Sequence, residues 1–133
     1  GDIFSDISAA LGGSLATASS IIESNTGTML YEAPHGTAQD LYLKYLQSDG
    51  REAHFNPSAL IYAVANALDT LGEREGNEPL VAYAQRLKAA LIDTVDAGVI
   101  TADLRGKAGD PEAETLVDMH GFLDAVASRL SAA

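Results

Sequence analysis

A short polar segment and an asparagine further along the chain have the chemistry to hold a phosphorylated sugar. The segment contains His35, Gly36, Thr37 and Asp40, and the asparagine is Asn56. Gly36 allows a backbone N–H to approach a ligand closely, and the helix expected after it would offer its positive N-terminal end to a phosphate. His35 and Thr37 can donate to ribose or phosphate oxygens, and Asp40 can accept from sugar hydroxyls. Asn56 carries an amide of the kind that reads an adenine edge. The pattern predicts a nucleotide site, although His-Gly-Thr turns also occur in many unrelated loops.

Two aspartates near the start of the chain, Asp2 and Asp6, could bind a hard cation. They are four residues apart and share one face of the short helix expected over residues 1–13, where a Gly pair closes the segment. Two carboxylates on one face make half of a site suited to Mg²⁺ or Mn²⁺. The alternative is that these acids only stabilise the dipole at a helix start.

The charge balance excludes several partners. The 133 residues carry a net charge of −11 and are long enough to form one domain with a hydrophobic core. So acidic a surface repels nucleic-acid phosphates and anionic lipids, and we expect neither a nucleic acid nor a membrane as partner. An anionic nucleotide would bind only where local donors and a metal offset this charge.

Other sequence features predict where the chain works. It has no cysteine, hence no disulfide and no thiolate metal site, and no apolar run long enough to cross a membrane. We therefore expect a cytoplasmic protein, with a mitochondrial location still open. The sequence starts at Gly1 without a methionine, so we also expect a fragment of a longer protein.

The polar segment resembles the NAD(P)-binding loop of the isocitrate/isopropylmalate dehydrogenase family, which comprises metal-dependent decarboxylating dehydrogenases of 2-hydroxy acids. The matching residues are Glu32-Ala33-Pro34-His35-Gly36-Thr37-Ala38 followed by Asn56-Pro57. The family's metal segment is matched by Gly1, Asp2, Ser5 and Asp6, and its Gly-x-x-Thr-x-Asp-Leu segment by Gly98, Thr101, Asp103 and Leu104. The resemblance covers essentially the whole chain and is greatest to the carboxy-terminal part of an isocitrate dehydrogenase.

The resemblance implies a set of site residues. The expected NAD-binding residues are Glu32, His35, Gly36, Thr37, Ala38, Asp40, Asn56 and Asp103. Asp2 and Asp6 are the expected ligands of Mg²⁺ or Mn²⁺, with Asp2 the first of the two. Thr101 and Asp103 could instead serve only as capping and turn residues.

Asp40 indicates which nucleotide is bound. By the resemblance, NADP-using members carry a basic residue at this point of the loop, facing the 2′-phosphate. An aspartate can accept hydrogen bonds from both ribose hydroxyls of NAD, whereas its contact with the phosphate of NADP would cost on the order of 1–3 kcal/mol. We therefore predict NAD over NADP.

The catalytic and substrate-binding groups implied by the resemblance are missing from this chain. In the family, arginines, a tyrosine and a lysine serve the substrate, and the lysine comes from the second subunit of a dimer. No residue here is therefore predicted to be catalytic. The family reaction would be oxidation of isocitrate by NAD with loss of CO₂ to give 2-oxoglutarate, in a homodimer acting on a small 2-hydroxy acid. We expect the chain alone to be inactive.

Two other functions compete with this one. The chain could be a stand-alone nucleotide-binding or regulatory module that has lost catalysis. It could also be a helical interaction domain whose loop motif is residual, in which case it would bind no nucleotide.

The expected fold is α/β, a helix-rich portion of the family's large domain with a few strands. The chain has no Gly-x-Gly-x-x-Gly turn, so it is not a Rossmann unit. Within one domain we expect four regions: a metal segment at 1–13, a cofactor loop at 31–57, a helical scaffold at 57–97 and a terminal helix at 113–131. Short strands are expected at 21–22 and 28–31 around a turn at 25–27, and an extended segment at 98–104.

Helix limits and faces follow from caps and apolar spacing. We expect one helix from Pro57 to Leu71 with Gly72 beyond its end, and a second after the N-cap Asn77, ended by Gly98. The expected buried faces are Leu41, Tyr45 and Leu46 after the polar segment; Leu60, Ile61, Val64, Leu68 and Leu71; Leu80, Ala84, Leu87, Leu91 and Val95; and Leu116, His120, Leu123, Ala127 and Leu130.

Four residues keep two possible roles. Tyr42 and Tyr45 could stack on adenine or belong to the core. His54 could line the adenine pocket or lie in solvent. His120 is expected to be a hydrogen-bonded core histidine rather than a ligand.

Overall fold

The computed structural model describes residues 20–33, 38–48, 56–106 and 111–132. Several predictions fall outside this described part: the helix at 1–13 with Asp2 and Asp6, the turn residues His35, Gly36 and Thr37, and the loop residue His54. Most described residues are helical and a few form short strands, which confirms the expected helix-rich α/β architecture. No helix in the described ranges is both long and apolar enough to cross a membrane.

Two small sheets and four long helices make up the described chain. In order, the elements are β1 (Ser20–Glu23), β2 (Met29–Glu32), α2 (Ala38–Ser48), α3 (Ser58–Glu75), α4 (Glu78–Asp96), β3 (Val99–Ile100), the 3₁₀ turns η2 (Ala102–Leu104) and η3 (Pro111–Ala113), β4 (Thr115–Leu116) and α5 (Met119–Ala132). β1 and β2 form an antiparallel hairpin, and β3 pairs with β4 in parallel. The strands and the turn at 25–27 are close to where the sequence predicts them.

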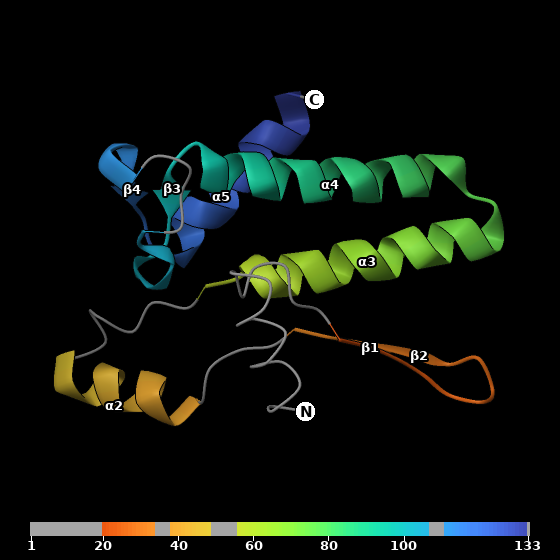
Figure 1. Cartoon of the computed structure of the whole chain (residues 1–133), viewed down its shortest axis with the longest axis horizontal. Helices are drawn as coiled ribbons and strands as arrows, with labels where there is room; N and C mark the ends of the chain where they lie inside the picture. The colour runs from red at the N-terminus through yellow and green to blue at the C-terminus, as the bar shows by residue number, and fades with distance from the viewer. Residues whose placement is uncertain (1–19, 34–37, 49–55, 107–110, 133) are drawn as a thin grey trace.

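α3 and α4 lie side by side as an antiparallel pair joined by Gly76 and Asn77 (Figure 1). Gly76 has a φ of 64°, the left-handed conformation that glycine adopts most easily at a helix end. The Asn77 N–H donates to the carbonyl of Gly72, which closes the end of α3. Asn77 Oδ1 accepts from the Leu80 N–H at 3.1 Å, so Asn77 caps α4 as predicted.

The prediction that α3 ends at Leu71 is wrong. The helix continues to Glu75, and Gly72 is buried within it. A Cβ at Gly72 would lie 2.8 Å from Val81 Cγ2 and 3.0 Å from the Val81 backbone nitrogen. Gly72 therefore allows the two helices to approach closely instead of stopping α3.

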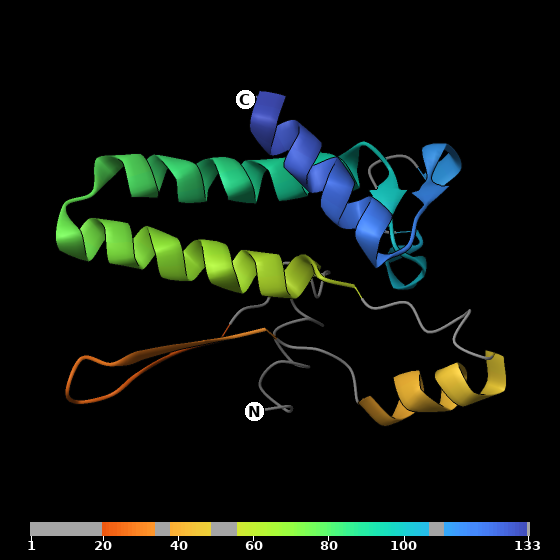
Figure 2. The ribbon, with the colours of Figure 1, turned by 180° about the vertical axis from the view of Figure 1, so that it is seen from behind.

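The hydrophobic core lies where α4, α5 and the β3–β4 sheet meet. α5 crosses α4 (Figure 2), and between them Leu91, Ile100 and Phe122 are at most 2% exposed. Ala90, Leu104 and Val126 complete this core cluster. One aromatic ring from α5 thus packs against a helix and a strand that are adjacent in the sequence, which holds the carboxy-terminal elements together.

The parallel β3–β4 pair begins at a glycine. The Thr115 N–H donates to the Gly98 carbonyl at 2.7 Å, and the Val117 N–H donates to the Ile100 carbonyl at 2.9 Å. Gly98 has a φ of 80°, and a Cβ there would lie 2.7 Å from the carbonyl oxygen of Ala113. Only glycine fits this close backbone approach.

The terminal helix begins later than predicted and buries a different face. α5 starts at Met119 rather than 113, because residues before it pair with β3 and Asp118 caps it, with Oδ1 accepting from the Gly121 N–H at 2.8 Å. His120 is exposed, so the expectation of a core histidine is wrong. The face that reaches the core has Phe122 and Val126 buried and the predicted Leu130 packed against them, partly buried.

Several other predicted buried positions are exposed. Leu60, Val64 and Leu71 of α3, and Leu116 and Leu123 near the end of the chain, are between 38% and 51% exposed. The buried residues of α3 are small instead: Ser58, Ala63, Ala65 and Gly72. Small residues are what a helix presents where its backbone approaches a neighbouring helix closely. The predicted face of α4 is confirmed at Ala84 and Leu91.

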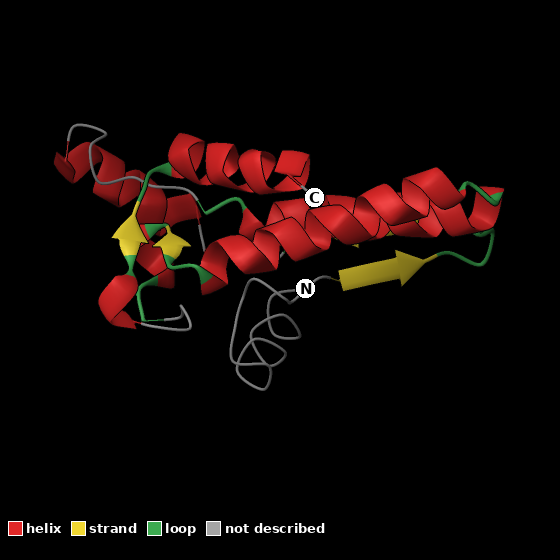
Figure 3. Ribbon diagram, turned by 90° about the horizontal axis from the view of Figure 1, so that it is seen from above, coloured by secondary structure: helices red, strands yellow, loops and turns green. Residues whose placement is uncertain are grey.

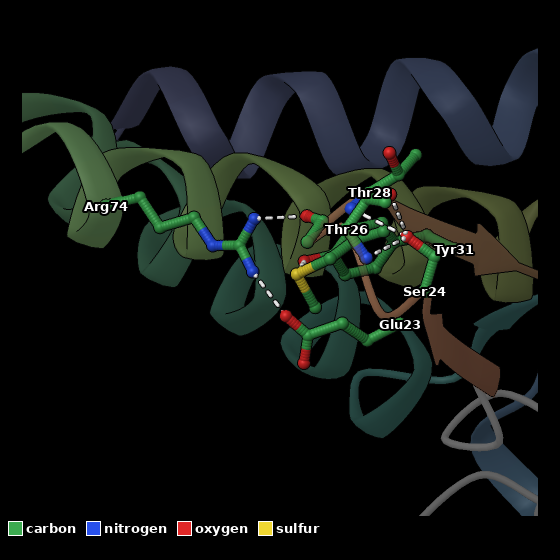
Figure 4. A network of polar contacts seen from close by, with 8 residues as sticks. Glu23, Ser24, Thr26, Thr28, Tyr31 and Arg74 are labelled. Carbon is green, nitrogen blue, oxygen red and sulfur yellow. Dashed lines mark hydrogen bonds and ion pairs between the residues drawn. The ribbon is translucent and has the colours of Figure 1, made fainter.

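The β1–β2 hairpin runs alongside α3 and is tied to it by Arg74 (Figure 3). Arg74 Nη2 lies 3.0 Å from Glu23 Oε1, and Arg74 Nη1 donates to the Gly27 carbonyl at 3.0 Å (Figure 4). Within the turn, the Ser24 hydroxyl accepts from the Thr28 N–H. Side chains of Arg74 and Glu23 are about half exposed, so this tether is a surface contact.

α2 stands away from the other helices in both side views (Figures 1 and 2). Tyr42, Tyr45 and Leu46 are 60%, 54% and 57% exposed. The prediction that Tyr45 and Leu46 face a core within this chain is therefore wrong. The hairpin is equally open, with Ile21, Ile22 and Leu30 at least half exposed.

A polar cluster lies between α3 and α4. Asp69 Oδ2 accepts from Lys88 Nζ at 2.6 Å and from Gln85 Nε2 at 2.7 Å, and the side chains of Asp69 and Lys88 are about 15% exposed. The Lys88 ammonium lowers the pKa of Asp69 below its ordinary value, helped by Gln85 and opposed by burial. The cluster therefore links the two helices through a charged pair largely removed from water.

Candidate functional site

The start of α3 positions Asn56, the predicted adenine-reading residue. Pro57 has no N–H and holds its own φ near helical values, so the chain turns into the helix directly after Asn56. Asn56 Oδ1 accepts from the Ser58 N–H at 2.9 Å, which satisfies a donor that the helix leaves unpaired at its first turn. The amide oxygen is thereby held against the helix start.

The end of β3 positions Asp103. Thr101 is fully buried directly after the strand, and Leu104 is buried in the core. The turn between them is closed by the Leu104 N–H, which donates to the Thr101 carbonyl at 2.9 Å. Thr101 Oγ1 also donates to Asp103 Oδ1 at 2.7 Å, so the exposed carboxylate is held from the buried side.

These two segments meet in one hydrogen bond. Asn56 Nδ2 donates to Asp103 Oδ2 at 2.9 Å, across 47 positions of sequence. Two residues from distant segments, both expected to bind the cofactor, thus lie side by side. Asn56 is half-buried and Asp103 is exposed, so both can be reached from solvent.

For the other predicted site residues, the structure gives only a place in the fold or no description. Glu32 ends β2 with an exposed side chain, opposite Ser20 in the hairpin. Ala38 and Asp40 lie in the first turn of α2. His35, Gly36 and Thr37 lie outside the described residues, as do Asp2 and Asp6. Among the residues that are described, no three acidic, histidine or cysteine side chains gather as a metal site.

Sequence reasoning missed how this site is assembled. Hydrogen-bond partners 47 positions apart leave no periodic signal, so the link from Asn56 to Asp103 could not be predicted. Two local signals were available. Asn-Pro-Ser is typical of a side-chain-closed turn at a helix start, and Thr-x-Asp permits the hydroxyl-to-carboxylate bond that Thr101 makes.

Comparison with known proteins decides the family. The sequence model of the isocitrate/isopropylmalate dehydrogenase family matches residues 1–126. The chain belongs to this family. It is 34% identical to the mitochondrial NADP isocitrate dehydrogenases of Sus scrofa and Homo sapiens over its whole length, and 38% identical to that of Saccharomyces cerevisiae over 98% of its length. It spans 30–32% of the length of these relatives.

Asn56 and Asp103 both lie in segments matched by the family model. The matched residues include the loop that resembles the family's NAD(P)-binding loop and the Thr-x-Asp-Leu segment that borders it. The family therefore supports a dehydrogenase-like part. The relatives just named are NADP enzymes by name, whereas the sequence predicts NAD for this chain.

Proposed function

We propose that this chain is the cofactor- and metal-binding part of an NAD-dependent isocitrate dehydrogenase. The observation that carries the proposal is the hydrogen bond between Asn56 and Asp103, because it joins two residues that the family resemblance assigns to the cofactor, at an accessible position. Family membership and the isocitrate dehydrogenase relatives support the reaction class. The proposed reaction is the oxidative decarboxylation of isocitrate to 2-oxoglutarate.

NAD would lie with its adenine against Asn56, near the end of the loop at 31–57. Its sugar and phosphates would lie toward residues 35–40 of the same loop. Asn56 offers the amide that an adenine edge pairs with. The first turn of α2 has backbone N–H groups without partners inside the helix, and with the helix dipole they would stabilise an anionic group. When bound, NAD supplies the hydride acceptor, and this chain's residues bind and orient it.

The proposed choice of NAD over NADP rests on Asp40. Asp40 lies in the first turn of α2, and the family resemblance assigns this point of the loop to the adenosine ribose. A carboxylate can bind two ribose hydroxyls but repels a 2′-phosphate. The relatives' names favour NADP, so this is the part of the proposal most open to a direct test.

The metal and catalytic parts of the proposal come from the sequence. Asp2 and Asp6 carry the oxygen donors that Mg²⁺ and Mn²⁺ prefer, so their chemistry fits a metal role. The groups that hold the substrate and move its proton would come from the rest of the protein and from a second subunit. We expect the isolated chain to bind nucleotide without turning over isocitrate.

The cytoplasmic location remains a prediction. The relatives are mitochondrial by name, and the described helices include no membrane span. A homodimer with an isocitrate-like substrate is likewise proposed for the whole protein.

Calorimetric titration with NAD and with NADP, each with and without Mn²⁺, tests the proposal. We expect saturable NAD binding and NADP binding weaker by about tenfold, the effect of one like-charge contact. Asp40→Arg should reverse the preference toward NADP, and Asp40→Asn, which removes only the charge, should bring the two affinities together. Equal affinities in the unchanged chain, or an Asp40→Arg chain that still prefers NAD, would contradict the assignment of Asp40.

A further inference from the structure

The cluster of Asp69, Gln85 and Lys88 places a charged pair within an interface of small residues. On α3, Asp69 lies between Ala65 and Gly72, which are about one turn away on either side along the same face of the helix. Ala65 and Gly72 are both buried. Alanine and glycine interlock little with a neighbouring helix, so this part of the interface does little by itself to fix the position of α4 along α3.

Asp69 accepts hydrogen bonds from two successive turns of α4. Its Oδ2 atom accepts from Gln85 Nε2 at 2.7 Å and from Lys88 Nζ at 2.6 Å. A shift of α4 by one turn along its axis, about 5 Å, would carry at least one of these two donors out of reach. We propose that this cluster is an alignment device, which holds α4 at one position along α3 at a cost in stability.

The cost in stability arises at the other oxygen of the carboxylate. Asp69 Oδ1 is buried and has no hydrogen-bond partner among the described residues. The side chains of Asp69 and Lys88 are about 15% exposed, so both charges have lost most of their hydration. A buried ion pair with an incomplete set of hydrogen bonds recovers less free energy than well-packed apolar side chains of similar size. What such a pair adds is a fixed alignment of the two helices.

The cluster lies between the turn that joins the two helices and the far end of the helical pair. Gly76 and Asn77 form that turn, and Asp69 lies about two turns of helix before Gly76, or about 10 Å along the axis. The turn therefore holds the helices at one end only. The cluster holds them further along, toward the end where α3 begins and α4 leads into β3. No nucleotide or metal is needed for this role.

Thermal unfolding tests the cost in stability. The double variant Asp69→Leu with Lys88→Met replaces the charged pair by apolar side chains of similar shape. We expect its Tm to equal or exceed that of the unchanged chain. Asp69→Leu alone leaves Lys88 buried without its charge partner, so its Tm should be lower than that of the unchanged chain. A double variant that melts below the unchanged chain would overturn the cost in stability.

The distance between spin labels on the two helices measures the alignment. The chain has no cysteine, so Leu60→Cys on α3 and Ile92→Cys on α4, both at exposed positions, provide the only two labelling sites. We expect one narrow distance distribution in the labelled chain. In the double apolar variant it should broaden over a range of up to about 5 Å, one helical turn. Gln85→Ala, which removes one donor and leaves the charges paired, should broaden it in part. An equally narrow distribution in both variants would overturn the alignment role.

Glu73→Leu with Arg86→Met is the matched control. It removes one acid from α3 and one base from α4 with the same replacement residues, but both side chains are exposed. The distance distribution should stay as narrow as in the labelled chain without these changes. Broadening as large as in the double apolar variant at Asp69 and Lys88 would mean that any loss of charge loosens the helical pair, which would overturn the alignment role.

Discussion

The two ends of the described chain differ in how completely they bury their apolar residues. The unit from α3 to α5 closes a core in which Leu91, Ile100 and Phe122 are at most 2% exposed. The hairpin and α2 carry residues just as apolar, yet Ile22 and Tyr45 are each 54% exposed. A protein rarely leaves so many large apolar side chains open without a partner surface.

The difference divides the residues of the proposed site between the two regions. Asn56 and Asp103 belong to the packed unit and are already hydrogen-bonded. Asp40 belongs to α2, which is not packed against that unit. The chain also spans only about 30% of its relatives' length. We therefore expect the adenine end of the site to be preformed, and the ribose end to depend on further contacts.

The aromatic ring of Phe122 at the centre of the packed unit should contribute most to stability. Phe122→Ala removes a fully buried side chain and should lower the free energy of unfolding by about 3–5 kcal/mol. Thermal and urea unfolding measure this loss. Tyr45→Ala on α2 is the matched control and should change it by no more than about 0.5 kcal/mol. Comparable losses in the two variants would show that α2 is packed in solution.

The charged pair between α3 and α4 should make the packed unit sensitive to acid. The pKa of Asp69 is lowered, so its ionised form stabilises the fold above its ordinary pKa of 3.8, and this contribution is lost as the pH falls through the lowered value. Asp69→Asn should cost about 1–3 kcal/mol at neutral pH by leaving Lys88 without its charge partner.

Urea unfolding at pH 7 and at successively lower pH measures both effects. The unchanged chain should lose stability below pH 4 more steeply than Asp69→Asn. Equal slopes in the two chains would show that another carboxylate governs the acid response.

The contact between the hairpin and α3 should contribute little to stability. Arg74→Ala removes the tether between the hairpin and α3 and should cost less than about 1 kcal/mol, because the ion pair is exposed. Hydrogen exchange should nevertheless increase at the hairpin amides and remain unchanged at α4. Arg86→Ala, an exposed arginine on α4, serves as the control. Unchanged hairpin exchange in Arg74→Ala would show that other contacts hold the hairpin.

Local chemistry made much of the fold predictable. Asn77 followed by Pro79 fixes the start of α4, and Gly98 fixes its end, because caps act through residues only a few positions away. The strand-turn-strand pattern around Gly27 was predictable for the same reason. At the site, Asn56 and Asp103 were predictable from the family resemblance, and the structure adds that they touch.

The failures have one physical cause, which is that burial depends on neighbours distant in sequence. Gly72 reads as a helix stop, but Val81 packs against it from the next helix. The apolar spacing around His120 predicts that this face of the helix is buried. Instead, the residues before α5 pair with β3, and α5 buries Phe122. Apolar spacing identifies an amphipathic helix and does not say what will cover it.

The two-residue connection between α3 and α4 has a consequence for the order of folding. Contacts across Gly76 and Asn77 join residues close in sequence, so little chain entropy is lost in forming the helical pair. The Asn56–Asp103 bond closes a loop of 47 positions and needs β3 in place first. On refolding, the helical pair should therefore form early and the Asn56–Asp103 contact late, so that the proposed binding surface appears only once the structure beneath it is complete.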